Sequence, residues 1–389
     1  MADVAITEKR VTWAELFFDL VYVFAVTEVS ALLHADHSWA GVLRALVVFV
    51  PIYWSWVGTS VLANTQDLSA AASRIGMFSV ALAGLFMALA VPEAYGERGI
   101  LFGCAYLAAR VVLAIMLFRR IPFTLNPIAV GLVVSGPLIF AGGFAHGSAR
   151  EAIWAVAAAI DLSSPTILQG RLRAMRFDPS HLAERFGLLL IIALGESVVA
   201  IGGPAASDRH LSAGVLAAVA TAFVLACGLW WVYFHFAADA MRYAMTTAQV
   251  QTHIARHVMS YGHLMLVGAV ISIAVGMREA VVRPGDQLSW GVTGLLLGGC
   301  ALYLATFGYT RWAMFRLVST TRLTASAVVL ALLPVAPHLP ALAALMLVAA
   351  VLVVLNVVEY VRVRGALVAQ NSGQAEVGED AGVHEASDG

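Results

Sequence analysis

Residues 13–33 read WAELFFDLVYVFAVTEVSALL, and this stretch decides the class of the protein. A helix of about 20 mainly apolar residues crosses the hydrocarbon core of a bilayer. The stretch has that length, yet it carries the carboxylates Glu15, Asp19 and Glu28. A charge at the bilayer centre costs at least about 2.5 kcal/mol, so such acids usually face a bundle interior, a partner or a water-filled cavity. The sequence therefore predicts a membrane helix that carries part of a functional site.

The composition extends this prediction to the whole chain. Hydrophobic residues make up 61% of the sequence and charged residues 12%, with a mean hydropathy of +0.85. Soluble domains are only about 45–50% apolar and about 25% charged. The formal net charge of -1 gives no basic field for nucleic acid. We therefore predict an all-α, polytopic membrane helix bundle that contacts membrane lipids and binds no nucleic acid.

The apolar stretches predict about twelve transmembrane helices. They lie near residues 13–34, 39–64, 73–92, 99–118, 127–146, 151–169, 182–203, 211–237, 256–277, 288–310, 318–336 and 340–361. In the loops and at the ends of these spans, sixteen lysines and arginines fall on one side of the membrane and five on the other. Because cytoplasmic loops are enriched in Lys and Arg, the asymmetry predicts cytoplasmic N- and C-termini.

A basic loop divides the predicted helices into two sets of six. We expect a cytoplasmic N-terminal segment, a first half, a basic cytoplasmic loop, a second half and a disordered acidic tail at residues 1–12, 13–169, 170–181, 182–362 and 363–389. Both halves would then begin with a helix that runs in the same direction. Parallel halves of this kind are known in transporters, whose binding sites lie where the halves meet.

The first helix of the second half echoes the first helix of the chain. Residues 181–203 read HLAERFGLLLIIALGESVVAIGG. Glu184 matches Glu15 in its local sequence, and Glu196 falls roughly where Glu28 does. Two interpretations stay open: an internal duplication, and a chance similarity of two leucine-rich helices.

Three motifs in these two helices resemble the sequence pattern of one protein family. They are ELFFDLVYVFA at Glu15–Ala25, ERFG at Glu184–Gly187 and LGES at Leu194–Ser197. Later matches are Asn64–Asp67 with Arg74, Trp230–Phe234, and Tyr261–His263 with Gly276 and Glu279. Over about residues 11–360 the chain resembles the bacterial low temperature requirement protein A (LtrA) family. The resemblance implies a multi-pass protein of the bacterial plasma membrane, linked by name to growth in the cold, and it supplies no substrate or reaction.

The acids of the first helix differ in their expected roles. Glu15 and Asp19 are four residues apart and share a helix face, so they repel each other. One of them could carry a proton or be neutralised by a cation. Glu15 also suits a plain role as a cap at the helix N-terminus. Glu28 lies about 13 Å beyond Asp19 and about half a turn round the helix, so it cannot line the same narrow stripe.

The second echoing helix carries its own candidate residues. Glu184 and Arg185 lie at its cytoplasmic edge, where they either support a site or form a solvated helix end. Glu196 lies about 18 Å deeper along the axis. Gly195 beside it permits close approach of another helix. We therefore predict that Glu196, like Asp19, binds an ion or belongs to a polar network.

Arg110 stands alone in the middle of the fourth predicted span. A buried arginine needs a carboxylate partner, and the candidates are Asp19, Glu28, Asp161 and Glu196. Such a pair is either structural or serves an anionic substrate or a gate.

The histidines give weaker signals. His253 and His257 have the spacing of two metal ligands on one helix face, but no glutamate lies between them as in HExxH, and we predict no metal site. His263 and Glu279 could form a proton relay, although a hydrogen-bonded core histidine is the simpler interpretation.

Two functions remain open at this stage. In the first, the protein is a transporter or ion pathway in which Asp19, Glu28 and Glu196 bind protons or monovalent cations. In the second, it is an intramembrane enzyme that acts on a lipid or isoprenoid-like substrate with these carboxylates as acid and base. A polar route that reaches both faces of the membrane would favour the transporter. An apolar cavity that ends at a pair of acids would favour the enzyme. The sequence holds no phosphate-binding glycine loop with a lysine, so we expect no cofactor, and it leaves an oligomeric partner open.

Overall fold

The computed structural model describes residues 9–67, 70–207 and 211–385, with side chains as far as Arg364 apart from Ser207. Every regular element in these ranges is helical. The α-helices are α1 (Trp13–Ala35), α2 (Trp39–Thr65), α3 (Ala71–Ala90), α4 (Gly99–Phe118), α5 (Pro127–Val130), α6 (Gly136–Gly142), α7 (Gly147–Ile167), α8 (Gln169–Leu172), α9 (Pro179–Ser207), α10 (Ala213–Phe234), α11 (Ala238–Thr247), α12 (Gln251–Ile254), α13 (His263–Val282), α14 (Trp290–Phe315), α15 (Thr320–Ala331) and α16 (Ala341–Glu385). Wider turns at η2 (Gly131–Ser135) and η3 (Ala255–Gly262), and tighter turns at η1 (Val91–Glu93) and η4 (Ala336–His338), join or extend them. The predicted all-α membrane bundle is confirmed.

Nine helical stretches in the described part of the chain are long and apolar enough to cross a membrane. They are Trp13–Ala35, Trp39–Thr65, Ala71–Glu93, Gly99–Phe118, Pro179–Ala206, Ala213–Thr247, Gln251–Val282, Trp290–Phe315 and Ala341–Arg364. The other three predicted spans coincide with helical stretches that fall short. Pro127–Gly142 is too short, α7 contains Arg150, Glu151 and Asp161, and α15 has only 12 residues. The number of twelve spans therefore stays a prediction.

Hydroxyl side chains fix where several helices begin. Thr12 and Glu15 form a capping box at the start of α1, in which each side chain bonds the backbone N–H of the other residue. Ser38, Ser212 and Ser289 accept a backbone N–H at the starts of α2, α10 and α14. These bonds satisfy N–H groups that have no partner inside the helix. The interpretation of Glu15 as a cap therefore holds, although this residue also has a second partner, described below.

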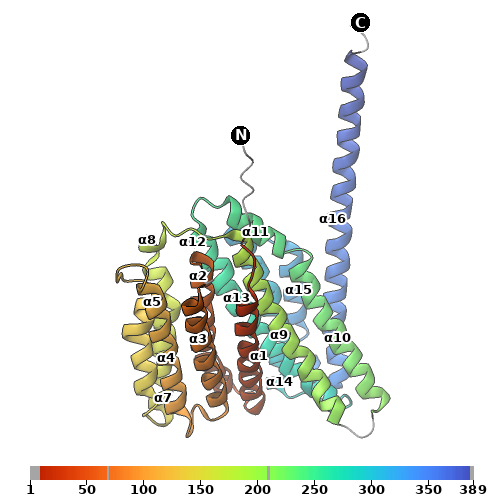
Figure 1. Cartoon of the computed structure of the whole chain (residues 1–389). Coiled ribbons are helices and arrows are strands. Elements are labelled where there is room, and N and C mark those ends of the chain that lie inside the picture. Colours follow the sequence, from red (N-terminus) through yellow and green to blue (C-terminus); the bar gives the residue numbers. More distant parts are fainter. Residues whose placement is uncertain (1–8, 68–69, 208–210, 386–389) are drawn as a thin grey trace.

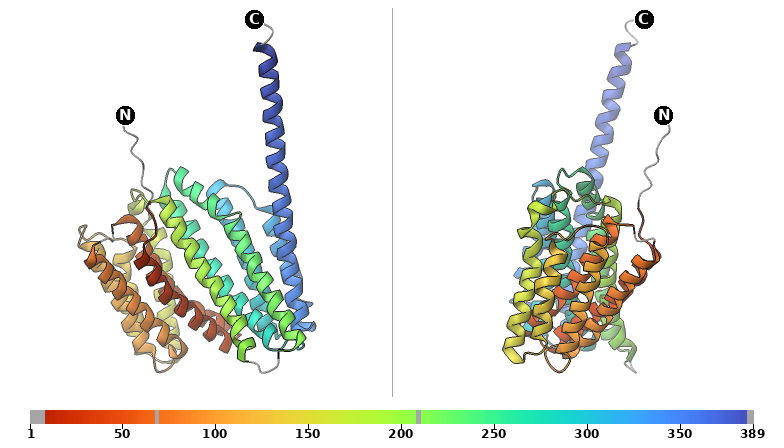
Figure 2. Two further views of the ribbon diagram at one scale, coloured as in Figure 1. Left: turned by 45° about the vertical axis from the view of Figure 1, so that its right-hand side comes forward. Right: turned by 60° about the vertical axis from the view of Figure 1, so that its left-hand side comes forward.

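The helices form two rings with the same order of neighbours. In the first ring, α1 packs on α2 and α3, α3 on α4, α4 on α6, α6 on α7, and α7 returns to α2. In the second, α9 packs on α10 and α13, α13 on α14, α14 on α15, α15 on α16, and α16 returns to α10. The rings meet where α1 and α2 contact α9 and α13 (Figures 1 and 2). The contact between α1 and α9 is therefore central to the molecule.

One end of the bundle is rich in arginine. The start of α1, α8, α11 and α12 lie at this end, and α16 extends beyond the bundle on the same side (Figure 1). Its arginines include Arg119, Arg120, Arg171, Arg173, Arg176, Arg242 and Arg256. We call this end the basic face and the other end the opposite face.

The C-terminal region differs from its predicted form. The sequence predicts a disordered tail over residues 363–389, whereas α16 continues as a helix to Glu385. The continuation lacks proline and contains alanine, glutamate and glutamine, which favour helix. Residues 386–389 of the predicted tail, residues 1–8 of the predicted N-terminal segment and Arg209 lie outside the described residues.

Candidate functional site

The acids at the start of α1 face the interior of the bundle. Glu15 and Asp19 are each 2% exposed, whereas Phe17 and Leu20 on the outer side of the same helix are 57% and 63% exposed. An apolar outside and a charged inside fit a helix whose outer surface meets lipid. The structure therefore places both acids where they need partners from other helices.

Asp19 is paired with Arg185 of α9. Arg185 Nη1 donates to Asp19 Oδ2 at 2.7 Å, and Trp56 Nε1 of α2 donates to Asp19 Oδ1 at 2.8 Å. Arg185 is fully buried and also donates to the backbone oxygen of Glu15 and to Ser60 Oγ. The interpretation of Arg185 as part of a solvated helix end is therefore wrong. Both charges of the pair are inside the protein, and each is hydrogen-bonded.

Glu15 binds a histidine from the same helix as Arg185. Glu15 Oε1 lies 3.0 Å from His181 Nε2, and Glu15 Oε2 accepts from the backbone N–H and hydroxyl of Thr12 at 2.8 and 2.9 Å. Asn64 Oδ1 accepts from the Asp178 N–H, which fixes the orientation of the Asn64 amide. Asn64 Nδ2 then donates to His181 Nδ1 at 3.1 Å, so His181 Nε2 carries the proton that faces Glu15.

The N-terminal segment closes this group of side chains at the basic face. Lys9 Nζ donates to the backbone oxygens of Asn64 and Gln66 at 3.1 and 2.7 Å, and also to that of Ala63. The Lys9 backbone N–H bonds Asp178 Oδ2 at 3.3 Å. Burial lowers the pKa of the Lys9 amine. We call Glu15, Asp19, Trp56, Asn64, His181 and Arg185 the α1–α9 cluster.

The sequence carried a signal for this cluster that the predictions did not use. His181 and Arg185 are four residues apart, as are Glu15 and Asp19. A pair of acids and a pair of basic groups with equal spacing can meet face to face when two helices run side by side. Trp56 had no such signal, because its role depends on how α2 is rotated.

Glu196 forms a second polar contact between α1 and α9. It is 5% exposed, and Thr27 of α1 donates its hydroxyl to Glu196 Oε2. Thr27 lies eight residues after Asp19, which is about 12 Å along the helix. We call the line of contacts from the α1–α9 cluster to Glu196 the α1–α9 seam. No salt bridge in the described part of the chain includes Glu196.

The other two acids of these helices lie outside the seam. Glu28 is half-buried and forms neither a hydrogen bond nor a salt bridge with any described residue. Glu184 is exposed at the basic face and accepts from the Val11 N–H at 3.3 Å. The structure therefore brings Asp19 and Glu196 into one seam, and Glu28 lies in electrostatic range of Glu196 without a bond to it.

Between these two polar levels, α1 and α9 carry buried side chains and no charged residue. Tyr22 and Val26 of α1, and Leu189 and Ala193 of α9, are each at most 2% exposed. The Tyr22 hydroxyl is buried without a hydrogen-bond partner among the described residues. The seam is therefore closed in its middle.

The predicted relay between His263 and Glu279 is not formed. His263 is fully buried, with Nδ1 at 2.9 Å from the Met259 backbone oxygen and Nε2 at 2.7 Å from the Tyr233 hydroxyl. Glu279 instead faces His34 of α1, with 3.5 Å between Oε1 and Nε2, near the opposite face. His263 is thus a hydrogen-bonded core histidine, and α1 carries a titratable pair at each end.

Arg110 is paired within the first ring. Its Nη2 lies 2.9 Å from Oδ2 of Asp161 on α7, one of the four acids considered from the sequence. Tyr106 bonds both of these residues, and Ser135 donates to Asp161 Oδ1 at 2.6 Å. A second buried pair, between Arg322 and Glu359, was not predicted.

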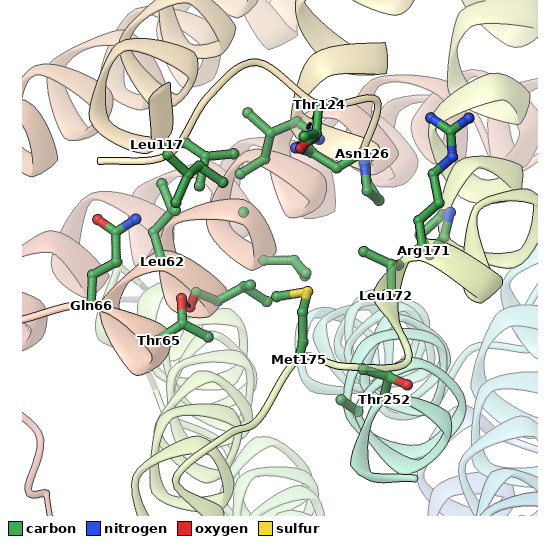
Figure 3. A pocket seen from close by; sticks show the side chains of 18 of the residues that line it. Leu62, Thr65, Gln66, Leu117, Thr124, Asn126, Arg171, Leu172, Met175 and Thr252 are labelled. Carbon is green, nitrogen blue, oxygen red and sulfur yellow. Dashed lines mark hydrogen bonds between the residues drawn. The ribbon is translucent and has the colours of Figure 1, made fainter. Parts of the chain in front are cut away.

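A cavity of about 1150 Å³ lies at the basic face, beside the cluster. It is lined by the ends of α2, α4 and α7, the α4–α5 connection, residues 171–177 and the start of α12. Figure 3 shows Leu62, Leu117, Leu172 and Met175 around it. We call it the basic cavity, because Arg110, Arg120, Arg171, Arg176 and Arg256 also line it.

Helix α2 forms the wall between the basic cavity and the cluster. Trp54, Gly58 and Leu62 line the cavity. Trp56 and Asn64 bond the residues of the cluster. The two sites therefore share one helix.

No metal centre is formed by the described residues, because they contain no group of three or more His, Cys, Asp or Glu side chains that could hold an ion. His253 and His257 have ring centroids 4.5 Å apart, and His257 Nδ1 lies 2.6 Å from the Tyr309 hydroxyl.

The family model described as Bacterial low temperature requirement A protein (LtrA) matches residues 10–357, which include the whole seam and the basic cavity. The chain belongs to the LtrA family. A protein of Rhizobium meliloti (strain 1021), described as uncharacterized, is 32% identical over 313 residues, which are 77% of this chain and 76% of that protein. No solved structure matches the chain. LtrA membership and the nine apolar helices of the described ranges identify a multi-pass membrane protein, and the function must come from the site.

Proposed function

We propose that this LtrA protein is a proton-coupled transporter of the bacterial plasma membrane, with its proton pathway along the α1–α9 seam. The observation that carries the proposal is the position of Glu196. It is a buried acid at the contact of the two rings, bonded by a hydroxyl and joined to no cation among the described residues.

The seam, together with the contact between α1 and α13, offers ionisable groups at several depths. The α1–α9 cluster lies near the basic face, Glu196 lies deeper, and the His34–Glu279 pair lies near the opposite face. Buried acids that face a bundle interior are typical of proton relays in transporters. Ionisable groups near both faces and at a level between them are the feature that favours transport over catalysis.

A proton suits this seam better than a metal cation. Asp19 already binds Arg185, and Glu15 already binds His181, so a sodium or potassium ion would have to displace these partners. Glu196 has no such partner in the described residues, and a bound proton would remove its charge without further ligands. Glu196 is therefore the proposed proton carrier.

The two rings give the protein its proposed means of movement. We infer that residues 13–169 and 182–362 are two parallel halves, because their helices have the same order of neighbours. Transporters of this construction change access by moving one half against the other. Such a movement would open the closed middle of the seam, which now excludes water.

We assign the basic face and both termini to the cytoplasm. The support is the excess of arginine at that face, since cytoplasmic loops are enriched in Lys and Arg. The proton pathway would then connect the cytoplasm with the outside through the α1–α9 contact.

The enzyme alternative gains no support from the site. Glu15, Asp19 and Glu196 are absent from the described residues that line the basic cavity. A substrate in that cavity would meet arginines rather than a pair of acids.

The experiment is a flux measurement on the purified full chain in liposomes. Proton, sodium and potassium gradients are applied in turn, with and without a small-molecule extract of bacterial cytoplasm, and protein-free liposomes serve as the control. We expect the protein to speed the decay of the proton gradient in at least one of these conditions. Sodium or potassium flux without proton movement would contradict the proposal. Because the family is named for growth at low temperature, growth of a deletion strain in the cold gives a second, cellular readout.

A further inference from the structure

We propose that the basic cavity binds an amphiphilic organic anion, a molecule with one apolar body and a phosphate or carboxylate head, taken from the water at the basic face. This names the substrate class of the proposed transporter and in that respect rests on the proposed function. The binding itself does not depend on it.

The first argument is charge. Five arginines line the cavity, and Asp67 is the one carboxylate among the described lining residues. Arg110 is neutralised by Asp161. No salt bridge among the described residues involves the other four, which are Arg120, Arg171, Arg176 and Arg256. Guanidinium groups bind phosphates and carboxylates through paired N–H donors, so an anion is the complementary ligand.

Two of these arginines are held in place by neutral groups. Arg120 donates to the Asp67 backbone oxygen at 3.0 Å and to Ser73 Oγ at 3.3 Å. Arg256 donates to the Pro165 backbone oxygen and to Gln169 Oε1, both at 3.1 Å. Such contacts orient a guanidinium and leave its positive charge for a ligand.

The second argument is the apolar wall. Leu62 and Leu117 line one side of the cavity, and Leu172 and Met175 line the other (Figure 3). Ligand pockets usually have volumes of about 300–1,000 Å³, so 1150 Å³ is far more than an inorganic anion needs. A bare phosphate would leave most of the apolar wall without contacts. An anion with an apolar body uses both kinds of lining.

The third argument is access. The lining comes from helix ends and connections at the basic face, where the loops meet water. Arg110 lies about 12 Å along α4 from its end at Phe118, so the cavity reaches well into the bundle. A soluble anion can therefore enter from the water with its apolar end first and keep its head at Arg171 and Arg176.

The cavity is joined to the α1–α9 cluster at two places. Across α2, Leu62 lines the cavity and Asn64 bonds His181. In the segment before α9, Phe177 lines the cavity and its neighbour Asp178 bonds Asn64. A ligand that moves α2 or this segment would thus disturb the Glu15–His181 contact, which gives a physical link between substrate and proton.

The test measures binding to the purified full chain in nanodiscs of zwitterionic lipid by calorimetry, with empty nanodiscs subtracted. The probes are hexyl, heptyl and octyl phosphate, with octyl glucoside as the neutral probe and inorganic phosphate as the headgroup alone. We expect octyl phosphate to bind at least tenfold more tightly than either comparison probe. Each added methylene should tighten binding about fourfold, as expected when its surface leaves water.

A matched pair of variants tests the arginines. Arg171→Gln with Arg176→Gln removes two exposed charges from the lining, and we expect octyl phosphate affinity to fall at least tenfold. Arg173→Gln with Arg242→Gln removes two exposed charges from the same face outside this lining, and we expect less than a twofold change. Equal effects of the two double variants would overturn the proposal, because the charge effect would then be general.

Other outcomes also decide the matter. Equal binding of octyl phosphate and octyl glucoside would overturn the proposal, as would equal binding of inorganic phosphate. A diacyl phospholipid that copurifies with the wild type, disappears in the Arg171, Arg176 variant and resists octyl phosphate would show a membrane lipid as the occupant instead. Octyl phosphate binding by a protein that moves no protons would support this site and refute only the proposed function.

Discussion

Helices α1 and α9 meet at two levels that differ in how charge is balanced. Near the basic face, Asp19 forms a salt bridge with Arg185 and accepts from Trp56, and Glu15 accepts from Thr12 and bonds His181. At the deeper level, Glu196 is bonded by hydroxyl groups of α1, Thr27 foremost, and forms no salt bridge with a described residue. A carboxylate–guanidinium pair buried between two helices fixes their register, because separating the charges costs about 3–5 kcal/mol. An acid without a cationic partner can gain or lose a proton at a lower cost in free energy. The comparison therefore assigns the register to the α1–α9 cluster and the proton to Glu196.

The largest expected effect comes from breaking the paired level. Arg185→Ala leaves the Asp19 charge buried without its partner, and we expect a loss of about 3–5 kcal/mol in stability with a lower folded yield. The double change Asp19→Ala, Arg185→Ala should recover only part of this loss, because Asp19 is no longer an unpaired charge but Glu15 still loses the guanidinium 3.8 Å from its Oε1. Melting in detergent, compared for both variants and the wild type, checks this. A wild-type melting curve for Arg185→Ala would show that the pair does not hold the helices together.

The buried pair Arg110–Asp161 tests whether the loss of the α1–α9 contact is specific to the pair Asp19–Arg185. Arg110→Ala leaves Asp161 with the hydroxyls of Tyr106 and Ser135, so we expect a smaller loss of about 3 kcal/mol. Because this pair lies within the first ring, the variant should leave the contact of α1 with α9 intact. Crosslinking of cysteines placed on α1 and α9 measures that contact. Loss of crosslinking in Arg110→Ala, at a temperature where the protein stays folded, would contradict the claim that only the pair Asp19–Arg185 holds α1 against α9.

The smallest effect on stability is expected at the deeper level. Thr27→Val removes the hydroxyl that bonds Glu196 and keeps the shape of the side chain. We expect a loss of about 1 kcal/mol, typical of one hydrogen bond, since the carboxyl can take up a proton instead. Detergent melting with Thr65→Val as the control compares this hydroxyl with one that bonds only its own helix. A loss as large as that of Arg185→Ala would show that Glu196 is a structural anchor.

The fold could be predicted from the sequence because its signals are local. Runs of apolar residues mark the helices, and Thr12 marks the start of α1 through its capping box. The number of spans was harder to predict, since α7 places Arg150, Glu151 and Asp161 in a helix that is otherwise apolar. Length and hydropathy alone do not decide whether such a helix crosses the membrane.

The site could be predicted only in part, because its partners come from distant segments. Asp19, Glu196 and Arg110 were found as charges in apolar surroundings. For Arg185 the sequence left two interpretations open, a supporting site residue and a solvated helix end, because it lies near a helix start; packing of α1 and α2 on α9 buries it. The same packing leaves Glu28 off the seam, a result that depends on helix rotation.

The central claim is that Glu196 carries the proton, and one measurement tests it most directly. Glu196→Gln keeps the size and the hydrogen bond of the side chain but cannot ionise. Glu184→Gln makes the same change at an exposed acid of the same helix. Proton flux is measured for both variants in liposomes, at equal protein content, under the condition in which the wild type moves protons. We predict that Glu196→Gln abolishes the flux and that Glu184→Gln retains most of it; wild-type flux in Glu196→Gln would contradict the account.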